Sequence, residues 1–458
     1  MRPSSPKLSR PLVVLLGTLL CSPAVLAKVA ADKAAQLGTT LTPVGAVEAG
    51  NKEGTIPAWK GGVLTLPPAF ANYQRESGLH YPDPFPQDKP RFKVDAGNLK
   101  QYAALLPVGA AKRLEINPKL YYNVYPTRRT ATYPDAVYDA TKANAITATL
   151  SGDDEIHDAT LGFPFPIPAN GAEAMINHRM RYRGDSVVQS GNTIVVSREG
   201  QFQVNGYELT AQFIYSNVKK AAEAGNELIF QIVRKDLSPP RLAGNITLVW
   251  DKLDGGREAW QYSPGTARVR QAPSVAFDNP VNGTDALQNV DQADLFNGSQ
   301  SRYTWKLVGK KEMLIPYNNY RLLRPELKLK DIIQPGHLNP EHLRYELHRV
   351  WVVEADLKPG SGNVFKKRRF YIDEDSWTIA AVDCYDARNT LWRYQEGFTL
   401  ALMLDKAVVS APQVTYDLFS GRYVINTLPN EQGFVAKFGT DFPQGYFTPQ
   451  NLKKLGRT

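Results

Sequence analysis

The chain has 458 residues, 43% of them hydrophobic and 22% charged, and a formal net charge of +9 at pH 7. Such a chain carries ample apolar side chains for a buried core, while its dispersed basic residues argue against a nucleic-acid-binding protein. Its two cysteines, Cys21 and Cys384, exclude an intramolecular disulfide framework, because Cys21 lies in a segment that we expect to be removed.

The first 27 residues are typical of a secretory signal peptide. Basic residues near the start precede an apolar stretch, and Val25-Leu26-Ala27 supplies compact residues for a cleavage site. The stretch is too short for a membrane span, which needs about 20 residues. A bulky leucine before Cys21 suits lipoprotein acylation poorly. We therefore predict cleavage after Ala27 and a periplasmic protein, and we leave an association with the outer membrane open.

Residues 28–184 form a segment rich in proline and aromatic residues. Prolines recur from Pro43 to Pro134, and each one fixes φ and removes a backbone donor, which favours a wrapping arm with short helices over a sheet. Aromatic residues such as Trp59 and Tyr125 are too frequent for a solvated linker. We expect the arm to pack its aromatic side chains onto the rest of the protein.

The arm ends in a predicted helix over residues 171–183. Asn170 is a favourable N-cap and Gly184 a favourable stop. Met175 and Ile176 fall at helical spacing with other apolar residues. The helix is therefore expected to be amphipathic and to bury one stripe.

From residue 185 to residue 430 the hydrophobic pattern has a period of two. Residues 345–355 alternate apolar and polar side chains, and residues 369–385 and 414–425 have the pattern of β-hairpins. Further strand-like runs cover residues 227–234, 244–252, 258–262, 267–271, 303–309, 312–316 and 391–402. Short turns between so many strands predict a mainly β protein with flanking helices (α+β), built on a large curved antiparallel sheet. Residues 431–458 are predicted to form a C-terminal tail.

The sheet region also holds many aromatic residues. Because each aromatic side chain buries about 150–250 Å², a filled core is the simplest interpretation. A curved sheet of this size also has room for an apolar cavity, and the sequence leaves both interpretations open. The predicted lining of such a cavity is Trp250, Trp260, Tyr262, Trp305, Trp351, Tyr371, Trp377, Trp392 and Tyr394 from the sheet, with Met175 and Ile176 from the helix.

Familiar catalytic signatures are absent. The sequence has no His-Glu-x-x-His metal motif, no phosphate loop of the Gly-x-x-x-x-Gly-Lys-Ser/Thr type and no Gly-x-Ser-x-Gly elbow. Cys384 lies in an alternating stretch, which favours a packing role over a nucleophile. Acidic residues 373–375 are interpreted as a hairpin tip, because they lack the spaced oxygen ligands that calcium needs. Basic residues 366–369 are interpreted as a solvated strand edge, with anionic lipid head groups as an alternative partner.

One segment offers metal-ligating side chains. His337, Glu341 and His342 supply imidazole and carboxylate groups, which suit zinc. Pro340 lies between the two histidines, so they need not share a helix face. Turn-capping and surface histidines are the alternative interpretation. A metal-dependent hydrolase requires the three side chains to converge in a cleft.

Several motifs together are similar to those of one bacterial family. They are Gly-Thr-Ile-Pro-Ala-Trp at 54–59, Tyr-Pro-Thr-Arg-Arg at 125–129, Pro-Phe-Pro-Ile-Pro at 164–168, Pro-Pro-Arg-Leu-Ala-Gly at 239–244 and Phe-Tyr-Ile-Asp-Glu-Asp-Ser-Trp at 370–377, with the stretches 34–45, 272–280, 305–312 and 345–354. Over essentially the whole mature chain, this pattern resembles the domain-of-unknown-function family number thirteen twenty-nine, of outer-membrane lipoprotein-sorting-like proteins. That family is similar to the periplasmic lipoprotein-localisation carriers.

The resemblance implies an incomplete antiparallel barrel that holds acyl chains, with the helix over residues 171–183 as its plug. Family members are often encoded with efflux-type transporters and outer-membrane proteins, which implies a role in moving hydrophobic molecules across the periplasm. The resemblance supplies no catalytic residues.

The leading functional hypothesis is therefore a periplasmic carrier or chaperone for a lipid, an acyl chain or another hydrophobic molecule, with no enzymatic activity, cofactor or metal. An accessory protein that docks onto an efflux-type transporter or an outer-membrane protein is the alternative, and it predicts an exposed apolar patch. A metal-dependent hydrolase built on His337, Glu341 and His342 is the third hypothesis. No nucleic-acid partner is expected.

Overall fold

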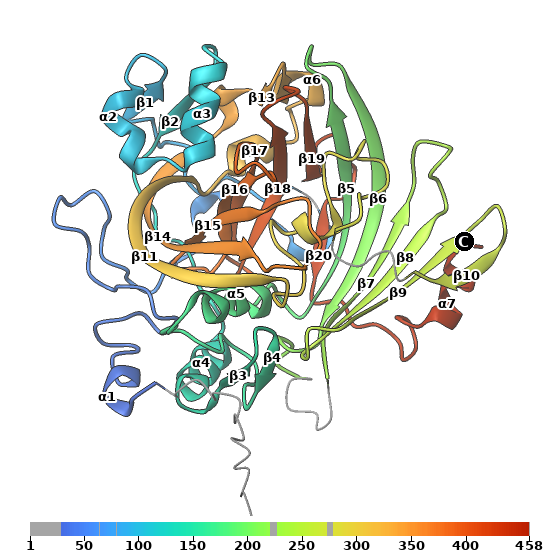
Figure 1. The fold of residues 1–458 in the computed structure, drawn as a ribbon, viewed down its shortest axis with the longest axis horizontal. Helices are drawn as coiled ribbons and strands as arrows, with labels where there is room; N and C mark the ends of the chain where they lie inside the picture. The colour runs from blue at the N-terminus through green and yellow to red at the C-terminus, as the bar shows by residue number, and fades with distance from the viewer. Residues whose placement is uncertain (1–28, 64, 79, 220–226, 273–277, 458) are drawn as a thin grey trace, which may run out of the picture.

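The computed structural model describes residues 29–63, 65–78, 80–219, 227–272 and 278–457 (Figure 1). The predicted signal peptide, residues 1–27, lies outside this part of the chain. Within it, no helix is long and apolar enough to cross a membrane. The α-helices are α1 (Ala31–Ala34), α2 (Leu99–Tyr102), α3 (Val108–Ile116), α4 (Asp135–Thr147), α5 (Gly171–Met180), α6 (Leu329–Ile332) and α7 (Pro449–Leu455).

One large sheet dominates the fold. Its strands are β1 (Phe92–Asp95), β2 (Tyr121–Val124), β5 (Ser186–Val196), β6 (Phe202–Phe213), β7 (Leu228–Asp236), β8 (Ile246–Lys252), β9 (Arg257–Ser263), β10 (Arg268–Gln271), β11 (Tyr303–Pro316), β14 (Tyr345–Leu357), β15 (Lys367–Asp373), β16 (Ile379–Tyr385), β17 (Leu391–Leu402), β18 (Ala407–Asp417), β19 (Tyr423–Leu428) and β20 (Ala436–Phe438). Two small pairs stand apart: β3 (Thr149–Ser151) with β4 (Glu155–His157), and β12 (Ile333–Gln334) with β13 (His337–Leu338).

The sheet curves without closing. Its 16 strands run in the order β1-β2-β14-β15-β16-β17-β18-β19-β5-β6-β7-β8-β9-β10, with β11 paired to β14 and β20 paired to β5. The two end strands do not pair with each other within the described residues (Figure 1). Pairing is antiparallel, except where β2 meets β14 in parallel at Val124 and Tyr345. The predicted fold class, mainly β with a large curved sheet and few helices, is confirmed.

Both faces of the sheet centre are buried. Val353 of β14 and its partner Phe370 of β15 belong to one apolar cluster, while the neighbouring partners Val352 and Tyr371 belong to another. Alternate residues of a strand point to opposite faces, so the two clusters lie on opposite sides of the sheet. Helix α5 contributes to the first cluster and α3 to the second. Cys384 of β16 is fully buried in the first cluster, as the sequence predicts.

Helix α5 begins where predicted and is more deeply buried than predicted. The Asn170 side chain accepts a hydrogen bond from the Glu173 backbone and caps the helix. The helix ends at Met180, and all ten of its residues are buried, including polar ones. Asn177, for example, is bonded to both backbone groups of Phe165, at 2.9 and 2.6 Å. The helix is therefore enclosed on every side. Its buried polar side chains are tolerated because they form hydrogen bonds with backbone groups of the loops around it.

The sheet extends beyond the segment where strands are predicted. Strands β1 and β2 come from the proline-rich arm, and Tyr122 of β2 packs its ring 4.5 Å from that of Tyr345 in β14. At the other end of the chain, β20 pairs with β5, and α7 packs on the outer strands β8, β9 and β10. Part of the predicted arm and part of the predicted tail are thus strand.

One predicted strand edge is an interior strand. Basic residues 366–369 run into β15, which lies between β14 and β16. Arg368 is fully buried and forms an ion pair with Asp291. Arg369 forms an ion pair with Glu354 across the β14–β15 pair. The expectation of a solvated edge is wrong, because these basic side chains are neutralised by partners on neighbouring segments.

Candidate functional site

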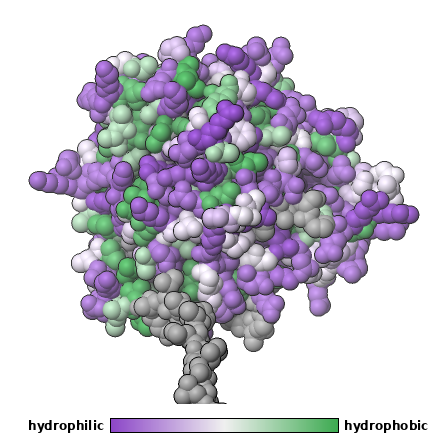
Figure 2. Space-filling view, in the orientation of Figure 1, coloured by the Kyte–Doolittle hydropathy of each residue, from purple (hydrophilic) through white to green (hydrophobic). Residues whose placement is uncertain are grey.

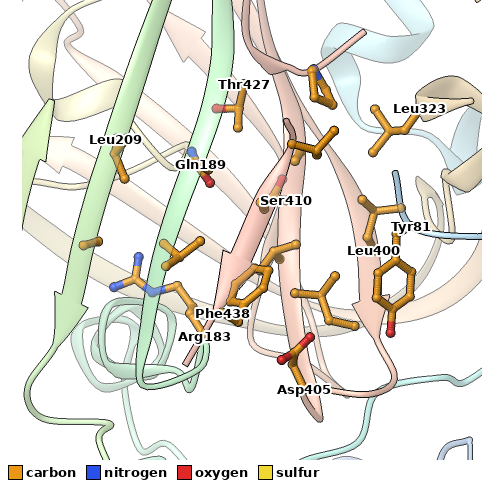
Figure 3. Close-up of a pocket in the computed structure, with 18 of the residues that line it drawn as sticks. Tyr81, Arg183, Gln189, Leu209, Leu323, Leu400, Asp405, Ser410, Thr427 and Phe438 are labelled. Carbon is orange, nitrogen blue, oxygen red and sulfur yellow. The ribbon is translucent and has the colours of Figure 1, made fainter. Parts of the chain in front are cut away.

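A cavity of about 240 Å³ lies against one face of the sheet (Figure 3). Strands β5, β6 and β7 supply one wall, and β17 and β18 supply the other. The apolar residues that line it are Val187, Leu209, Ala211, Phe213, Ile232, Leu323, Leu400, Leu402, Val409, Ala411, Pro429, Val435, Ala436 and Phe438. Its volume is below the roughly 300–1,000 Å³ of cavities that enclose a drug-sized ligand, so it suits a slender apolar chain.

The cavity exists because the sheet divides at this point. Strand β19 pairs with β18 at residues 413–416 and with β5 at residues 192–196. It ends at Leu428, and further along β5 the partner is β20, which pairs with Val187, Val188 and Gln189. The first half of β18, residues 407–410, pairs with β17. The two halves of the sheet therefore separate beyond the end of β19, and apolar side chains from both line the space between them.

The charged end of the cavity is built just after α5. Arg181 donates to both carboxylate oxygens of Asp294, at 2.6 and 2.8 Å, and Arg183 donates to one of them at 3.0 Å. Arg181 also donates to the backbone oxygen of His178, at 2.6 Å. Because α5 ends at Met180, the extended backbone that follows directs alternate arginines toward the cavity.

Electrostatics at this end reflect an excess of positive charge. Burial alone would raise the pKa of Asp294, but the neighbouring Arg181 and Arg183 outweigh it and lower this pKa to about 2. Burial, with the charge of Arg181, lowers the pKa of Arg183 to about 10. Burial and Arg181 likewise lower the pKa of His178 to about 3, so its imidazole is neutral at pH 7. Two guanidinium cations thus share a single carboxylate.

A segment of the arm, residues 73–78 and 80–81, covers one side of the cavity. We call it the cover segment. Tyr73, Arg75, His80 and Tyr81 line the cavity. Its polar contacts with the rim include the ion pair of Arg75 with Asp405. They also include hydrogen bonds of Val435 N to Gly78 O (2.7 Å), of Leu404 N to Tyr81 Oη (3.0 Å) and between His80 Nδ1 and Leu323 O (2.7 Å). These contacts, together with the packing of Tyr81 against both apolar clusters, hold the arm over the cavity.

The residues predicted to line a cavity pack elsewhere. Trp305, Trp377, Met175 and Ile176 belong to the core cluster around α5, against which Trp351 and Trp392 also pack. Tyr371 and Tyr394 are buried on the opposite face of the sheet. Trp250, Trp260 and Tyr262 lie beneath α7. None of them is among the lining residues of the cavity described here, and their role in binding stays a prediction.

A partial signal for the residues that form the site is present in the sequence. Arg179, Arg181 and Arg183 are noticeable as arginines at the end of an apolar helix, but the expected amphipathic pattern places them on its solvated side. Asp294 has no motif and lies 111 residues beyond Arg183. The aliphatic residues that line the cavity have the same sequence pattern as residues of a filled core, so the sequence does not distinguish them.

The predicted metal-ligating segment does not converge. His337 is buried and its Nδ1 lies 2.7 Å from the Leu338 backbone oxygen, while Glu341 is exposed and accepts a hydrogen bond from Tyr121. In the described part of the chain, the ligand-type side chains that do meet are His348, Asp373 and Asp375, whose ligand atoms lie within 4.8 Å of one another. The convergence that the hydrolase hypothesis requires is absent for His337, Glu341 and His342 among the described residues.

Acidic residues 373–375 lie at the turn that joins β15 to β16, which confirms the predicted hairpin tip, and all three side chains are buried. Arg129 of the arm binds Asp375 through two hydrogen bonds, at 2.6 and 2.8 Å. Burial, together with the charge of Asp375, raises the pKa of Asp373. Ser376 Oγ donates to Asp373 at 2.6 Å, and His348 lies 3.8 Å from it. We refer to residues 373–375 as the acidic turn. Asp375 pairs with Arg129 and Glu374 with Lys310, whereas the buried Asp373 Oδ1 has no hydrogen-bond partner among the described residues.

Comparison with known proteins places the chain in a family. A relative from Pseudomonas aeruginosa, an uncharacterised protein, is 39% identical over 447 residues, which cover 96% of this chain and 97% of the relative. Among solved structures, an outer membrane lipoprotein-sorting protein domain from Vibrio parahaemolyticus has a TM-score of 0.41 and 15% identity, and covers 60% of this chain and 94% of its own.

Two further structures show a likeness of similar extent. A DUF1329 family protein from Desulfovibrio piger has a TM-score of 0.40 and 12% identity, and covers 59% of this chain and 92% of its own. A LolA superfamily protein from Nitrosomonas europaea has a TM-score of 0.36 and 12% identity, and the match covers 61% of this chain and 98% of that protein's chain. The family model for proteins of unknown function DUF1329 matches residues 93–453. This chain belongs to the DUF1329 family.

Proposed function

We propose that the protein is a periplasmic carrier of a hydrophobic molecule, which it binds in the cavity between β5–β7 and β17–β18. The observation that carries this proposal is the cavity itself, whose walls are mostly aliphatic and aromatic, with charged residues gathered toward one end. Burying an apolar chain there contributes about 0.8 kcal/mol for each methylene removed from water. The proposed location follows from the signal-peptide pattern at the start of the chain.

The geometry suits reversible loading. The contacts of the cover segment with the rim include the ion pair of Arg75, whose side chain is 41% exposed, with the buried Asp405, and the packing of Tyr81 against both apolar clusters. An ion pair with a partly exposed arginine is weaker than a fully buried one, so the Arg75 end of the segment is where opening costs least. A carrier needs both a protected apolar site and an inexpensive way to open it.

The docking hypothesis has less support. It requires a contiguous exposed apolar patch. On the face seen in Figure 2, hydrophobic residues lie in small groups separated by hydrophilic ones. Of the large exposed apolar side chains, Ile116 and Phe419 line one hollow together, but polar residues such as Asn117 and Arg422 share its lining.

The first test is to identify what the protein carries. The protein is purified gently from the periplasm, extracted with organic solvent and analysed by mass spectrometry beside a matched periplasmic control. We expect a hydrophobic molecule in near-stoichiometric amount. An empty protein that also fails to bind the neutral fluorescent probe N-phenyl-1-naphthylamine would contradict the proposal.

A cavity-filling variant locates the binding. Ala436 lines the cavity from β20, and Ala436→Phe should weaken binding of the neutral probe at least tenfold, because its ring occupies the space of the ligand. Ala143→Phe adds the same ring on the exposed side of α4 and should leave binding unchanged. Equal binding by both variants would place the ligand elsewhere.

A further inference from the structure

The charges around the cavity are unevenly matched. Arg75 has its own partner in Asp405. Arg181 and Arg183, in contrast, share Asp294. The next carboxylate that acts on Arg183 is Asp251, which is already bonded to Arg257 at 2.6 and 2.9 Å. One buried positive charge at this end of the cavity therefore has no counter-charge of its own.

Hydrogen bonding shows the same shortfall. The Nε atoms of Arg181 and Arg183 are both buried, and neither has a hydrogen-bond partner. A buried donor on a charged group is costly to leave unbonded. A guanidinium offers paired donors in a plane, which match the two oxygens of a carboxylate or a phosphate.

Arg183 is the arginine that a ligand can reach. Its side chain is 17% exposed, whereas that of Arg181 is 1% exposed. The Arg183 guanidinium lies over the rings of Phe213 and Phe230, with Cζ 4.7 and 5.6 Å from their centres. These rings fix the plane of the guanidinium and leave its edge for hydrogen bonds.

The position of Arg183 also defines a direction. Figure 3 shows Arg183 and Asp405 toward one end of the cavity, with Leu323 and Thr427 toward the other. A ligand with its head at Arg183 would therefore extend its apolar part along Val187, Leu400 and Val409 toward Leu323.

We infer that the cavity takes an anionic amphiphile, that is, an apolar chain with a carboxylate or phosphate head, and that Arg183 binds the head while Arg181 holds Asp294 in place. This inference rests on the proposed carrier function and narrows it to a class of ligand. It distinguishes the cavity from a purely apolar site, which would take neutral and anionic chains equally.

The test compares four probes on the full mature chain by isothermal titration calorimetry: decanoate, decyl phosphate, decanol and inorganic phosphate. We expect decanoate and decyl phosphate to bind at least tenfold more tightly than decanol, and inorganic phosphate to bind far more weakly than decyl phosphate. Inorganic phosphate that binds as tightly as decyl phosphate would overturn the inference, because it would show an anion site that ignores the chain.

Substitution of Arg183 assigns the head group. Arg183→Met should reduce the affinity for decanoate at least tenfold and leave the affinity for decanol unchanged, whereas Arg183→Lys should keep part of the preference because it retains the charge. Arg388→Met, at an exposed turn, is the matched control. Circular dichroism confirms that each variant is folded.

The outcomes separate the two proposals. If decanol and decanoate bind equally well and Arg183→Met changes neither, the inference about the head group is wrong and the carrier function stands. If none of the chain-bearing probes binds, the carrier function itself is wrong. If Arg183→Met does not fold, the comparison of Arg183→Lys with the unmodified protein decides, because a loss of the preference for decanoate over decanol supports the inference and an unchanged preference contradicts it.

Discussion

The acidic turn and the charged end of the cavity are two buried polar clusters, the first crowded with carboxylates and the second with arginines. In the acidic turn, carboxylates crowd together, and burial and the charge of Asp375 raise the pKa of Asp373. At the cavity, two arginines share Asp294. A crowded carboxyl group can take up a proton and become neutral. An arginine keeps its proton at neutral pH, so its excess charge is relieved by a second anion. This difference is the reason why we propose the cavity, and not the acidic turn, as the binding site.

The largest expected effect is at the acidic turn. Arg129→Met would leave the Asp375 carboxylate buried without its cation, and we expect it to lower the free energy of unfolding by about 3–5 kcal/mol. Chemical denaturation of the mature chain measures the loss. Arg128, whose side chain is 45% exposed and paired with Asp88, supplies the neighbouring control: Arg128→Met should cost less than about 1 kcal/mol. Equal losses would mean that the burial of the Arg129 pair is unimportant.

Substitutions of Asp294 and of Arg183 should lower the free energy of unfolding by different amounts. Asp294→Asn would leave two guanidinium groups without a carboxylate, and we expect a loss of about 3 kcal/mol in unfolding free energy. Arg183→Met should cost about 1 kcal/mol or less, because Arg181 still binds Asp294 and the cluster becomes balanced. If Arg183→Met were the more damaging of the two, the excess positive charge described above would be wrong.

Acid should remove the stabilisation by Asp294 in a defined range of pH. The pKa of this group is about 2 in the folded protein, below the 3.8 of a free aspartate side chain. Its ionised form therefore stabilises the fold fully above the higher value, and the contribution is lost as the pH falls through the lower one. The stability difference between the unmodified protein and Asp294→Asn should shrink as the pH falls from about 4 to about 2. A difference that stays constant there would show that Asp294 is not ion-paired.

The smallest expected effect on stability concerns the cover segment. Arg75→Met removes the ion pair with Asp405, and we expect a change of less than about 1 kcal/mol in unfolding free energy, since the arginine is partly exposed. Release of a bound probe, followed by stopped-flow fluorescence, should nevertheless become several-fold faster. Unchanged release in this variant would assign the gating of the cavity to another part of the rim.

Much of the fold follows from patterns that the sequence displays. Residues 391–402 coincide with β17, and the predicted hairpin over residues 369–385 is formed by β15 and β16. Alternation identifies these strands because β-branched and aromatic residues recur at every second position. Two predicted runs, 303–309 and 312–316, are one strand, β11, in which the register shifts between Leu307 and Gly309. That irregularity interrupts the pattern without ending the strand.

Strands β5 and β6, which form a wall of the cavity, fall within the predicted sheet region, but neither corresponds to a predicted strand run. In β5, the polar stretch from Gln189 to Asn192 interrupts the alternation, and the second half of the strand is buried on both faces. Burial on both faces removes the period of two that marks a half-exposed strand. The position of the cavity could not be predicted for a related reason. Large aromatic residues indicate buried surface but not whether that surface is a filled core or a cavity. The aromatic residues predicted to line a cavity pack in cores, and most of the apolar residues that line the observed cavity are aliphatic.

The short strand β19 has a mechanical consequence. It is six residues long, and it is paired at four residues with β18 and at four with β5. Sheet pairing from the β14–β18 half to the β5–β10 half passes through this strand, as the strand order shows. Strand β19 is therefore in the position of a hinge between the two halves of the sheet. A rotation about β19 would widen the cavity beyond Leu428, while the hydrogen bonds between the strands within each half stay intact.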